Sequence, residues 1–319
     1  MTTKYNELIV SRALFNLNSR LTLTALAGLL SLNVLADEPF SVPQVDLAIK
    51  TDGQYVQVQE YQVPKDHEIG DGTIAYEGPG IESSKVAYRL YLDERSVLDV
   101  FGKKTTDPVL QNVGRGDDYH AMSDWGMDIL KVGNSLGAGG LGVYEDGKMR
   151  MVGPAQDLSV KVAITSPETA AFIVFHDGLE SASGSFDLHT RYSMTGDSRL
   201  LTVLARGSDD SPALAAGLVK HPGTELLQNP DQDKYGWAYI ATYGVQTLAD
   251  DQLGLAMFYK HRKNTEVKDD GATFGVIFND EKIIHYKVAA AWVAEPNGIK
   301  DIDAFKAYLD KELERLRSE

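Results

Sequence analysis

Apolar and polar residues alternate along much of the chain. The run Tyr55-Val-Gln-Val-Gln-Glu-Tyr-Gln-Val alternates, and so does Val86-Ala-Tyr-Arg-Leu-Tyr-Leu, in which Val86, Tyr88, Leu90 and Leu92 share one face. Successive side chains of a strand point to opposite faces, so both runs predict half-buried strands. Similar runs predict strands at residues 171–176, 186–194, 200–205, 237–243, 254–259, 273–278 and 283–292.

Short polar turns such as Thr195-Gly-Asp-Ser separate these runs, and no helical pattern alternates with them. The fold class predicted is therefore mainly β, a large antiparallel β-sandwich. A single helix is predicted at the end of the chain, where apolar residues recur at spacings of three and four. They are Ile302, Phe305, Leu309, Leu313 and Leu316, with Asp301 available as the N-cap.

The segment from residue 102 to 157 is Gly-rich and has no clear periodicity. A loop of this length inside a compact domain usually either has a function or contains regular elements that the pattern has not revealed. The segment contains Gly137-Ala-Gly-Gly-Leu-Gly, which formally matches the dinucleotide-binding fingerprint. A turn signal follows it where that motif needs a helix, so we reject nucleotide binding and expect the glycines to permit tight turns or close approach.

Residues 1–36 have the features of a secretory signal peptide. A basic start containing Lys4, Arg12 and Arg20 precedes a short apolar stretch, and Val34-Leu-Ala offers a cleavage site. We therefore expect a periplasmic or secreted protein with one catalytic domain at residues 37–319 and no membrane association after cleavage. The stretch is too short for a comfortable membrane span.

The composition narrows the chemistry. The chain of 319 residues carries 31 basic and 46 acidic side chains, a formal net charge of -15, which argues against binding nucleic acid. It contains no cysteine, which excludes disulfides, zinc–thiolate sites and cysteine nucleophiles. Its seven histidines show no metal-ligand spacing, so we predict neither a metal nor another cofactor, although histidines on different strands could meet in space and the sequence leaves a structural metal ion open.

The densest group of polar and aromatic residues lies between Arg115 and Lys131. It combines a His, a Tyr, a Trp and several carboxylates, a mixture suited to a sugar acid: aromatic faces pack on sugar C–H groups, and cations hold a carboxylate. The same composition is also typical of an ordinary irregular loop with core aromatics and capping charges. Outside it, Tyr259-Lys-His-Arg262 is read either as a carboxylate-binding stretch or as a charged edge strand.

Two stretches, Val86–Lys103 and Asp118–Gly140, resemble a family of exported bacterial proteins of unknown function. Members of that family are encoded with, or fused to, unsaturated-uronyl hydrolases, and one branch is an oligosaccharide dehydratase of ulvan degradation. The resemblance covers most of the mature chain. It implies a β-sandwich like those of mutarotases and polysaccharide lyases, and chemistry on uronic acids.

Such chemistry removes the C5 proton of a uronate, which requires a base, an acid for the group leaving C4 and a cation that neutralises the carboxylate. We assign His120 and Tyr119 to acid–base work, with their division open, and Lys131 and Arg89 to the carboxylate. The substrate-binding candidates are Asp124, Trp125, Tyr88, Tyr235, Trp237 and Arg262. One difficulty is that consecutive residues of a strand, such as Tyr119 and His120, point to opposite faces.

The function expected is elimination of water from the non-reducing terminal uronic acid of an acidic, ulvan-type oligosaccharide. The alternatives are a polysaccharide lyase using the same machinery, a non-catalytic periplasmic oligosaccharide-binding protein and a mutarotase-like epimerase. The sequence leaves open whether the chain forms a homodimer.

Overall fold

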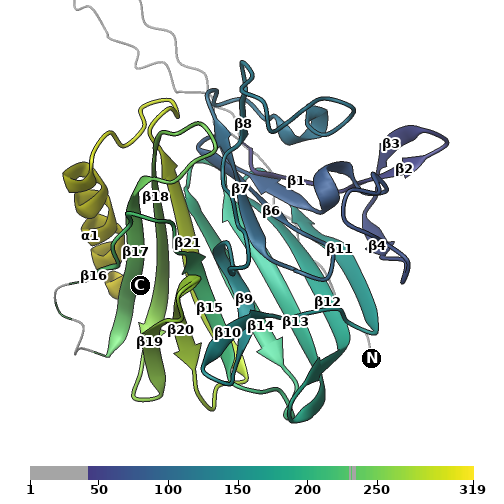
Figure 1. The fold of residues 1–319 in the computed structure, drawn as a ribbon. Coiled ribbons are helices and arrows are strands. Elements are labelled where there is room, and N and C mark those ends of the chain that lie inside the picture. The colour runs from purple at the N-terminus through teal and green to yellow at the C-terminus, as the bar shows by residue number, and fades with distance from the viewer. Residues whose placement is uncertain (1–41, 230, 232–234) are drawn as a thin grey trace, which may run out of the picture. The chain divides into compact units, whose positions relative to one another are not determined.

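The computed structural model describes residues 42–229, 231 and 235–319, so the predicted signal peptide lies outside the described residues. The largest sheet has nine antiparallel strands (Figure 1). In spatial order these are β16 (Leu227–Gln228), β17 (Gly236–Val245), β18 (Gln252–His261), β21 (Ile283–Trp292), β14 (Leu200–Gly207), β13 (Gly184–Thr195), β12 (Thr169–Ser181), β11 (Asp157–Thr165) and β4 (Glu60–Gln62).

Two five-stranded antiparallel sheets cover one face of this sheet. The first contains β1 (Gln44–Asp46), β5 (Gly80–Glu82), β6 (Val86–Leu90), β7 (Leu98–Lys103) and β8 (Gly126–Asp128). The second contains β10 (Lys148–Met151), β9 (Ala138–Glu145), β15 (Leu214–Val219), β20 (Thr273–Phe278) and β19 (Thr265–Asp269). A separate hairpin is formed by β2 (Ala48–Thr51) and β3 (Gln54–Gln57), and the short 3-10 helices are η1 (Ala75–Glu77) and η2 (Leu110–Asn112).

One continuous core joins the layers, because the three sheets contribute buried side chains to the same apolar cluster. Tyr88 and Val100 come from the first five-stranded sheet, Leu141 from the second, and Tyr192 and Val288 from the nine-stranded sheet. Alternation explains this, since the apolar residues of β13 face inward and its polar residues face outward, except for the buried Thr190. The prediction of a mainly β, antiparallel fold with a C-terminal helix is confirmed.

The helix α1 (Ile302–Ser318) packs on the outward face of the nine-stranded sheet, beside β17 and β18 (Figure 1). Its buried residues are four of the five predicted, namely Phe305, Leu309, Leu313 and Leu316, whereas Ile302 is exposed. The Asp301 side chain accepts a hydrogen bond of 2.8 Å from the amide of Ala304, as expected of an N-cap.

The Gly-rich segment is more regular than its sequence indicates, since it contains β8, β9 and β10. The glycines of β9 lie where neighbouring atoms leave no space for a side chain. A Cβ on Gly139 would lie 2.1 Å from Cγ1 of Val288, so this position requires glycine. The segment therefore approaches a neighbouring strand closely, which agrees with one of the two roles expected of its glycines.

Two strand predictions differ from the structure. The run at residues 55–63 is divided between β3 and β4, which belong to different sheets and are mostly exposed. In contrast, β6 is buried on both faces, because the loop at residues 104–125 covers the face that carries Arg89. Within the described part of the chain, no helix has the length and apolar character needed to cross a membrane.

Candidate functional site

The fully buried Arg89 organises a cluster of charged side chains on the first five-stranded sheet. It pairs directly with Asp99 across β6 and β7. Asp128 stands opposite Phe101, two residues along β7, so its side chain points to the same face as that of Asp99. One terminal nitrogen of Arg89 donates to Asp99 and, at 2.7 Å, to Asp128. The guanidinium thus joins three neighbouring strands.

Further groups accept hydrogen bonds from Arg89, although its buried Nε has no partner among the described residues. The same terminal nitrogen donates to the hydroxyl of Tyr91 at 2.5 Å, and the other donates to the carbonyl oxygen of Tyr76 at 3.0 Å. Tyr76 and Glu77 both have positive φ angles, 38° and 66°, which are unfavourable for residues with side chains. The backbone is therefore strained where it presents this carbonyl to Arg89.

Two buried carboxylates share this single buried cation. Burial and the negative charge of Asp99 raise the pKa of Asp128 to about 8, against the opposing effect of Arg89. The carboxyl group of Asp128 therefore changes its charge close to neutral pH. Such a group, held at the edge of a buried cluster, is suited to controlling a proton-transferring neighbour.

His120 lies between this buried cluster and the solvent. Its Nε2 lies 3.4 Å from Oδ2 of Asp128, while its Nδ1 lies 3.8 Å from Oδ1 of Asp118. The imidazole side chain is 54 % exposed, whereas that of Asp128 is only 2 % exposed. A buried carboxyl behind an accessible imidazole is suited to general acid–base catalysis.

Tyr119 lies beside His120, with ring centroids 4.4 Å apart, and packs its edge on Phe101. Burial raises the pKa of Tyr119, while Arg89 acts in the opposite direction. Residues 119 and 120 form a turn rather than a strand, so their side chains are not forced to opposite faces as they would be in a strand. The turn is fixed to β8 by a 2.8 Å hydrogen bond from the amide of Asp128 to the carbonyl of Tyr119.

A cationic pocket of about 480 Å³ lies next to this cluster. Its walls include Lys50 and Tyr55 from the β2–β3 hairpin and Arg115 from the long loop. The guanidinium carbon of Arg115 lies 5.5 Å from the Tyr55 ring centroid and 5.7 Å from that of Tyr76, the residue whose carbonyl binds Arg89. Arg115 also pairs with Asp46 at 2.7 Å. The pocket thus offers two cations and the ring of Tyr55, and Arg115 connects it to Tyr76, which contacts Arg89.

Several predicted site residues have other surroundings. Tyr88 faces the core, donates to the carbonyl of Arg199 at 2.7 Å and accepts from the amide of Ala290 at 2.8 Å. It is fully buried and has no surface with which to contact a sugar. Arg89 is equally inaccessible, so direct contact with a substrate carboxylate is not available to it. Both assignments are therefore corrected: Tyr88 is a core residue, and Arg89 positions the carboxylates.

The remaining candidates in the long loop also differ in exposure. Asp124 is exposed and forms no hydrogen bond or ion pair with the described residues. Trp125 is half-buried, and its ring centroid lies 6.2 Å from that of Phe101, so it anchors the loop. Lys131 is exposed near His221, where its charge helps burial to lower the pKa of that histidine.

Three candidates lie at the other end of the β17–β18 hairpin. Tyr235 and Trp237 are at the start of β17, and Arg262 follows β18. The opposite end of the hairpin is the one near the His120 cluster, because Thr247, just beyond the end of β17, forms a bridge with Leu130. The ten residues of β17 correspond to about 30 Å at the usual rise of a strand. The structure therefore does not bring these three residues to the His120 cluster.

Their local surroundings are distinct as well. Tyr235 is 69 % exposed and stacks on His261 with ring centroids 5.4 Å apart. Trp237 is nearly buried beneath Lys260, whose Nζ lies 4.3 Å from the ring centroid. Arg262 is paired with Glu281 at 2.6 Å.

The sequence did not single out Asp99, Asp128, Tyr91 or Lys50. A signal for the two carboxylates was present, because each interrupts an apolar run, Leu98-Asp-Val-Phe and Met127-Asp-Ile-Leu. A carboxylate in a buried strand needs a partner, which indicates a buried cation. Among the described residues, no three His, Asp or Glu side chains are arranged to hold a metal ion.

Fold and site together define an antiparallel β protein with a buried charge cluster that reaches solvent through a histidine. The chain belongs to the family described as a domain of unknown function, DUF4861, whose model matches residues 39–319. A comparison with curated proteins finds no match.

Proposed function

We propose that the protein is an oligosaccharide dehydratase that removes water from the non-reducing terminal uronic acid of acidic, ulvan-type oligosaccharides. The observation that carries the proposal is the exposed His120 imidazole held against buried Asp128, with Tyr119 beside it. The resemblance of residues 86–103 and 118–140 to proteins found with uronyl hydrolases supplies the substrate class. The predicted signal peptide supports a periplasmic or secreted location for the reaction.

In this proposal His120 is the base. When Asp128 is ionised, it accepts the Nε2–H of His120 and fixes the tautomer in which Nδ1 is free. Nδ1 takes the C5 proton of the uronate, and the electron pair of the C5–H bond forms the C4=C5 double bond as the C4–O bond breaks. The product is a 4,5-unsaturated uronyl group.

Tyr119 is the acid in the same step. Its raised pKa keeps the hydroxyl protonated at neutral pH, so it has a proton to donate to the oxygen leaving C4. The leaving group then departs as water. Arg89 beneath the Tyr119 ring, with its guanidinium carbon 5.7 Å from the centroid, stabilises the phenolate that remains.

Arg115 and Lys50 take the role of carboxylate neutralisation first assigned to Arg89 and Lys131. They line the neighbouring pocket and are not fully buried, as binding a substrate anion requires. A guanidinium is well suited to a carboxylate because it offers two parallel N–H donors. Neutralising the carboxylate stabilises the negative charge that develops as the C5 proton leaves.

The test is a reaction of the purified protein with ulvan, alginate and pectin oligosaccharides. We expect ultraviolet absorbance from the conjugated alkene, with loss of one water and unchanged chain length by mass spectrometry. We expect His120→Ala to abolish that signal while oligosaccharide binding largely survives. The control is His189→Ala, which removes another exposed histidine, paired with Asp177 at 2.9 Å on the nine-stranded sheet.

Three other outcomes would each contradict part of this proposal. Shortened chains with the same absorbance would make the protein a lyase. Binding without any change in mass or absorbance would leave the carbohydrate-binding protein and the epimerase as alternatives. Equal loss of activity in both variants would remove the special role of His120.

A further inference from the structure

A cavity of about 370 Å³ lies at the start of β17, beside the last turn of α1. Its lining includes Tyr235, Trp237 and Lys260 of the β17–β18 hairpin, together with Arg317 and Glu319 at the end of the chain. Tyr235 and Trp237 are two of the sugar-binding residues expected from the sequence that the structure separates from the His120 cluster. They therefore line a cavity of their own, large enough for a small ligand.

Tyr235 presents an aromatic ring to solvent at one wall of this cavity. It is 69 % exposed, whereas every other Phe, Tyr and Trp in the described part of the chain is buried or half-buried. The face of an aromatic ring is slightly negative and attracts the slightly positive C–H groups of a sugar. The exposed ring is therefore available to a carbohydrate ligand.

Tyr235 is held in place by a row of rings. It stacks on His261, and His261 in turn lies edge-on to the buried Tyr259 with ring centroids 6.5 Å apart. Nδ1 of His261 also lies 3.2 Å from the hydroxyl of Thr265. A ring that is fixed before binding loses little conformational entropy when a ligand arrives.

Lys260 supplies a cation beside this ring. It stands opposite Trp237 in the pairing of β17 with β18, and the nearly buried Trp237 ring supports its ammonium group. This contact orients the charge without neutralising it. Lys260 forms no ion pair with the described residues, whereas Arg262, the other strong cation of the same stretch, is paired with Glu281.

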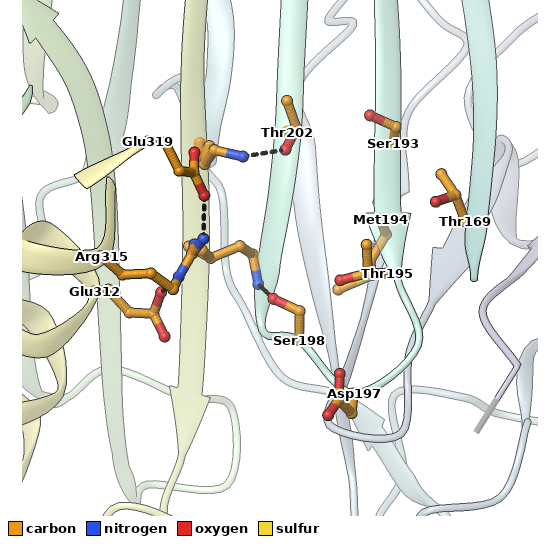
Figure 2. Close-up of a pocket in the computed structure, with 12 residues that line it drawn as sticks. Thr169, Ser193, Met194, Thr195, Asp197, Ser198, Thr202, Glu312, Arg315 and Glu319 are labelled. Carbon is orange, nitrogen blue, oxygen red and sulfur yellow. Dashed lines mark hydrogen bonds and ion pairs between the residues drawn. The ribbon is translucent and has the colours of Figure 1, made fainter. Parts of the chain in front are cut away.

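The other charged groups of the cavity already have partners. Arg317 pairs with Asp231 at 2.8 Å. Glu319 points toward Arg315 and is paired with it (Figure 2). The lining thus contains two cations and one carboxylate, and of these only Lys260 is without an oppositely charged partner among the described residues.

The cavity drawn in Figure 2 also lies beside α1, but its charges differ. It has a volume of about 470 Å³, and its lining contains three carboxylates, Asp197, Glu312 and Glu319, and two cations, Lys287 and Arg315. No aromatic ring lines it among the described residues. It therefore offers an acidic sugar neither an excess of cations nor a ring to pack against.

We propose that Tyr235, His261, Trp237 and Lys260 form a second glycan-binding site, which we call the tyrosine platform. A sugar residue packs on the Tyr235 ring, and its carboxylate or sulfate ester accepts hydrogen bonds from the Lys260 ammonium. Both anions offer the same recognition chemistry, namely charged oxygens that accept from a charged donor. Neutral glycans, which can use only the ring and uncharged hydrogen bonds, bind more weakly.

The tyrosine platform is distant from the His120 cluster. It lies at the start of β17, and the ten residues of that strand place it about 30 Å from the end that is near the cluster. The platform therefore goes beyond the proposed elimination: it holds an acidic glycan without reacting with it. Holding one part of a long glycan would raise the effective concentration of the remainder at the protein.

The experiment follows this site directly, by fluorine nuclear magnetic resonance of the full protein labelled with fluorotyrosine. The Tyr235 resonance is identified as the one missing in Tyr235→Phe. The probes are oligogalacturonate, a sulfated dextran oligomer and the neutral dextran oligomer. We expect at least one anionic probe to shift the Tyr235 resonance, and Lys260→Gln to weaken its affinity about tenfold, the effect of losing a charge-assisted hydrogen bond.

The matched control is Lys263→Gln, which removes an exposed lysine from the turn after β18 that does not line the cavity. We expect it to retain the parent affinity. Lys260→Arg keeps the charge and is expected to retain most of the affinity, which separates loss of charge from loss of local structure.

A shift caused by only one of the two anionic probes supports the proposal and identifies the anion. A Tyr235 resonance that none of the probes moves would overturn it. So would equal affinity for the neutral oligomer, or equal weakening by Lys260→Gln and Lys263→Gln. The resonance reports binding and not reaction, so failure of the dehydratase proposal, seen as absence of alkene formation, leaves this test intact.

Discussion

At the scale of single residues, the buried cluster holds one cation, Arg89, between two carboxylates. The pKa of Asp128 is raised to about 8, so the folded protein binds a proton there that the unfolded chain does not bind between pH 3.8 and 8. This group therefore lowers the free energy of unfolding as pH rises through that interval. The raised pKa also sets the pH at which Asp128 begins to support His120 as a base.

We predict that kcat/KM for elimination rises with pH in the parent, with an inflection near pH 8, and levels off above it. In Asp128→Asn the inflection disappears and activity falls by about 10²-fold, within the usual range for loss of acid–base support. The measurement is the initial rate of alkene formation between pH 6 and 10. Asp118→Asn is the control, since its exposed carboxylate lies 3.8 Å from the other ring nitrogen. An unchanged inflection in Asp128→Asn would refute the assignment.

At the scale of elements, the stability of α1 depends on the N-cap at its first turn. The carboxylate of Asp301 satisfies the amide of Ala304, which otherwise has no partner within the helix. We predict that Asp301→Ala lowers the free energy of unfolding by about 1 kcal/mol, the usual effect of losing an N-cap. Urea unfolding measures it, with Asp303→Ala as the control because Asp303 lies in the same turn but is not the cap. Equal losses in the two variants would show a general charge effect.

Regular elements were predictable where alternation or helical spacing was clear, as in β12, β13, β14 and α1. Prediction failed where the pattern was interrupted for a structural reason. The strand β9 contains three consecutive small residues, Ala138, Gly139 and Gly140, because neighbouring strands and loops approach it closely. Small residues give no alternation, so the segment resembled a loop. The strand β6 was predicted, but as half-buried, because the sequence does not show that the long loop covers its second face.

The site was predictable only in part, for a similar reason. His120 and Tyr119 are adjacent in sequence, so their proximity needed no knowledge of the fold. Asp99 and Asp128 are 29 residues apart, and they meet only because β7 pairs with β8. Conversely, Tyr235 belongs to a strand end about 30 Å away, a separation that composition does not reveal.

At the scale of the whole molecule, a buried histidine connects the two layers of the sandwich. Nε2 of His176 on β12 lies 2.8 Å from the hydroxyl of Ser96, in the turn between β6 and β7. Burial lowers the pKa of His176 to about 4. Between this value and the ordinary 6.5, the unfolded chain binds a proton that the folded protein does not, so stability decreases as pH falls.

We predict that His176 alone lowers the free energy of unfolding by about 3 kcal/mol between pH 7 and pH 4, since each pKa unit corresponds to about 1.4 kcal/mol. Urea unfolding at several pH values measures the effect. The slope decreases in His176→Asn and is retained in the exposed-site control His189→Asn. If both variants keep the parent slope, the buried histidine does not titrate as inferred.

The nine-stranded sheet also determines how copies of the molecule can meet. In the described chain its outermost strands are β16, with two residues, and β4, with three. Long exposed edges offer unpaired N–H and C=O groups on which another chain can add a strand and begin aggregation. At these two ends the terminal strands themselves offer only two and three residues for such pairing. A strand from another copy of the molecule would therefore find only a very short length of β16 or β4 to pair with.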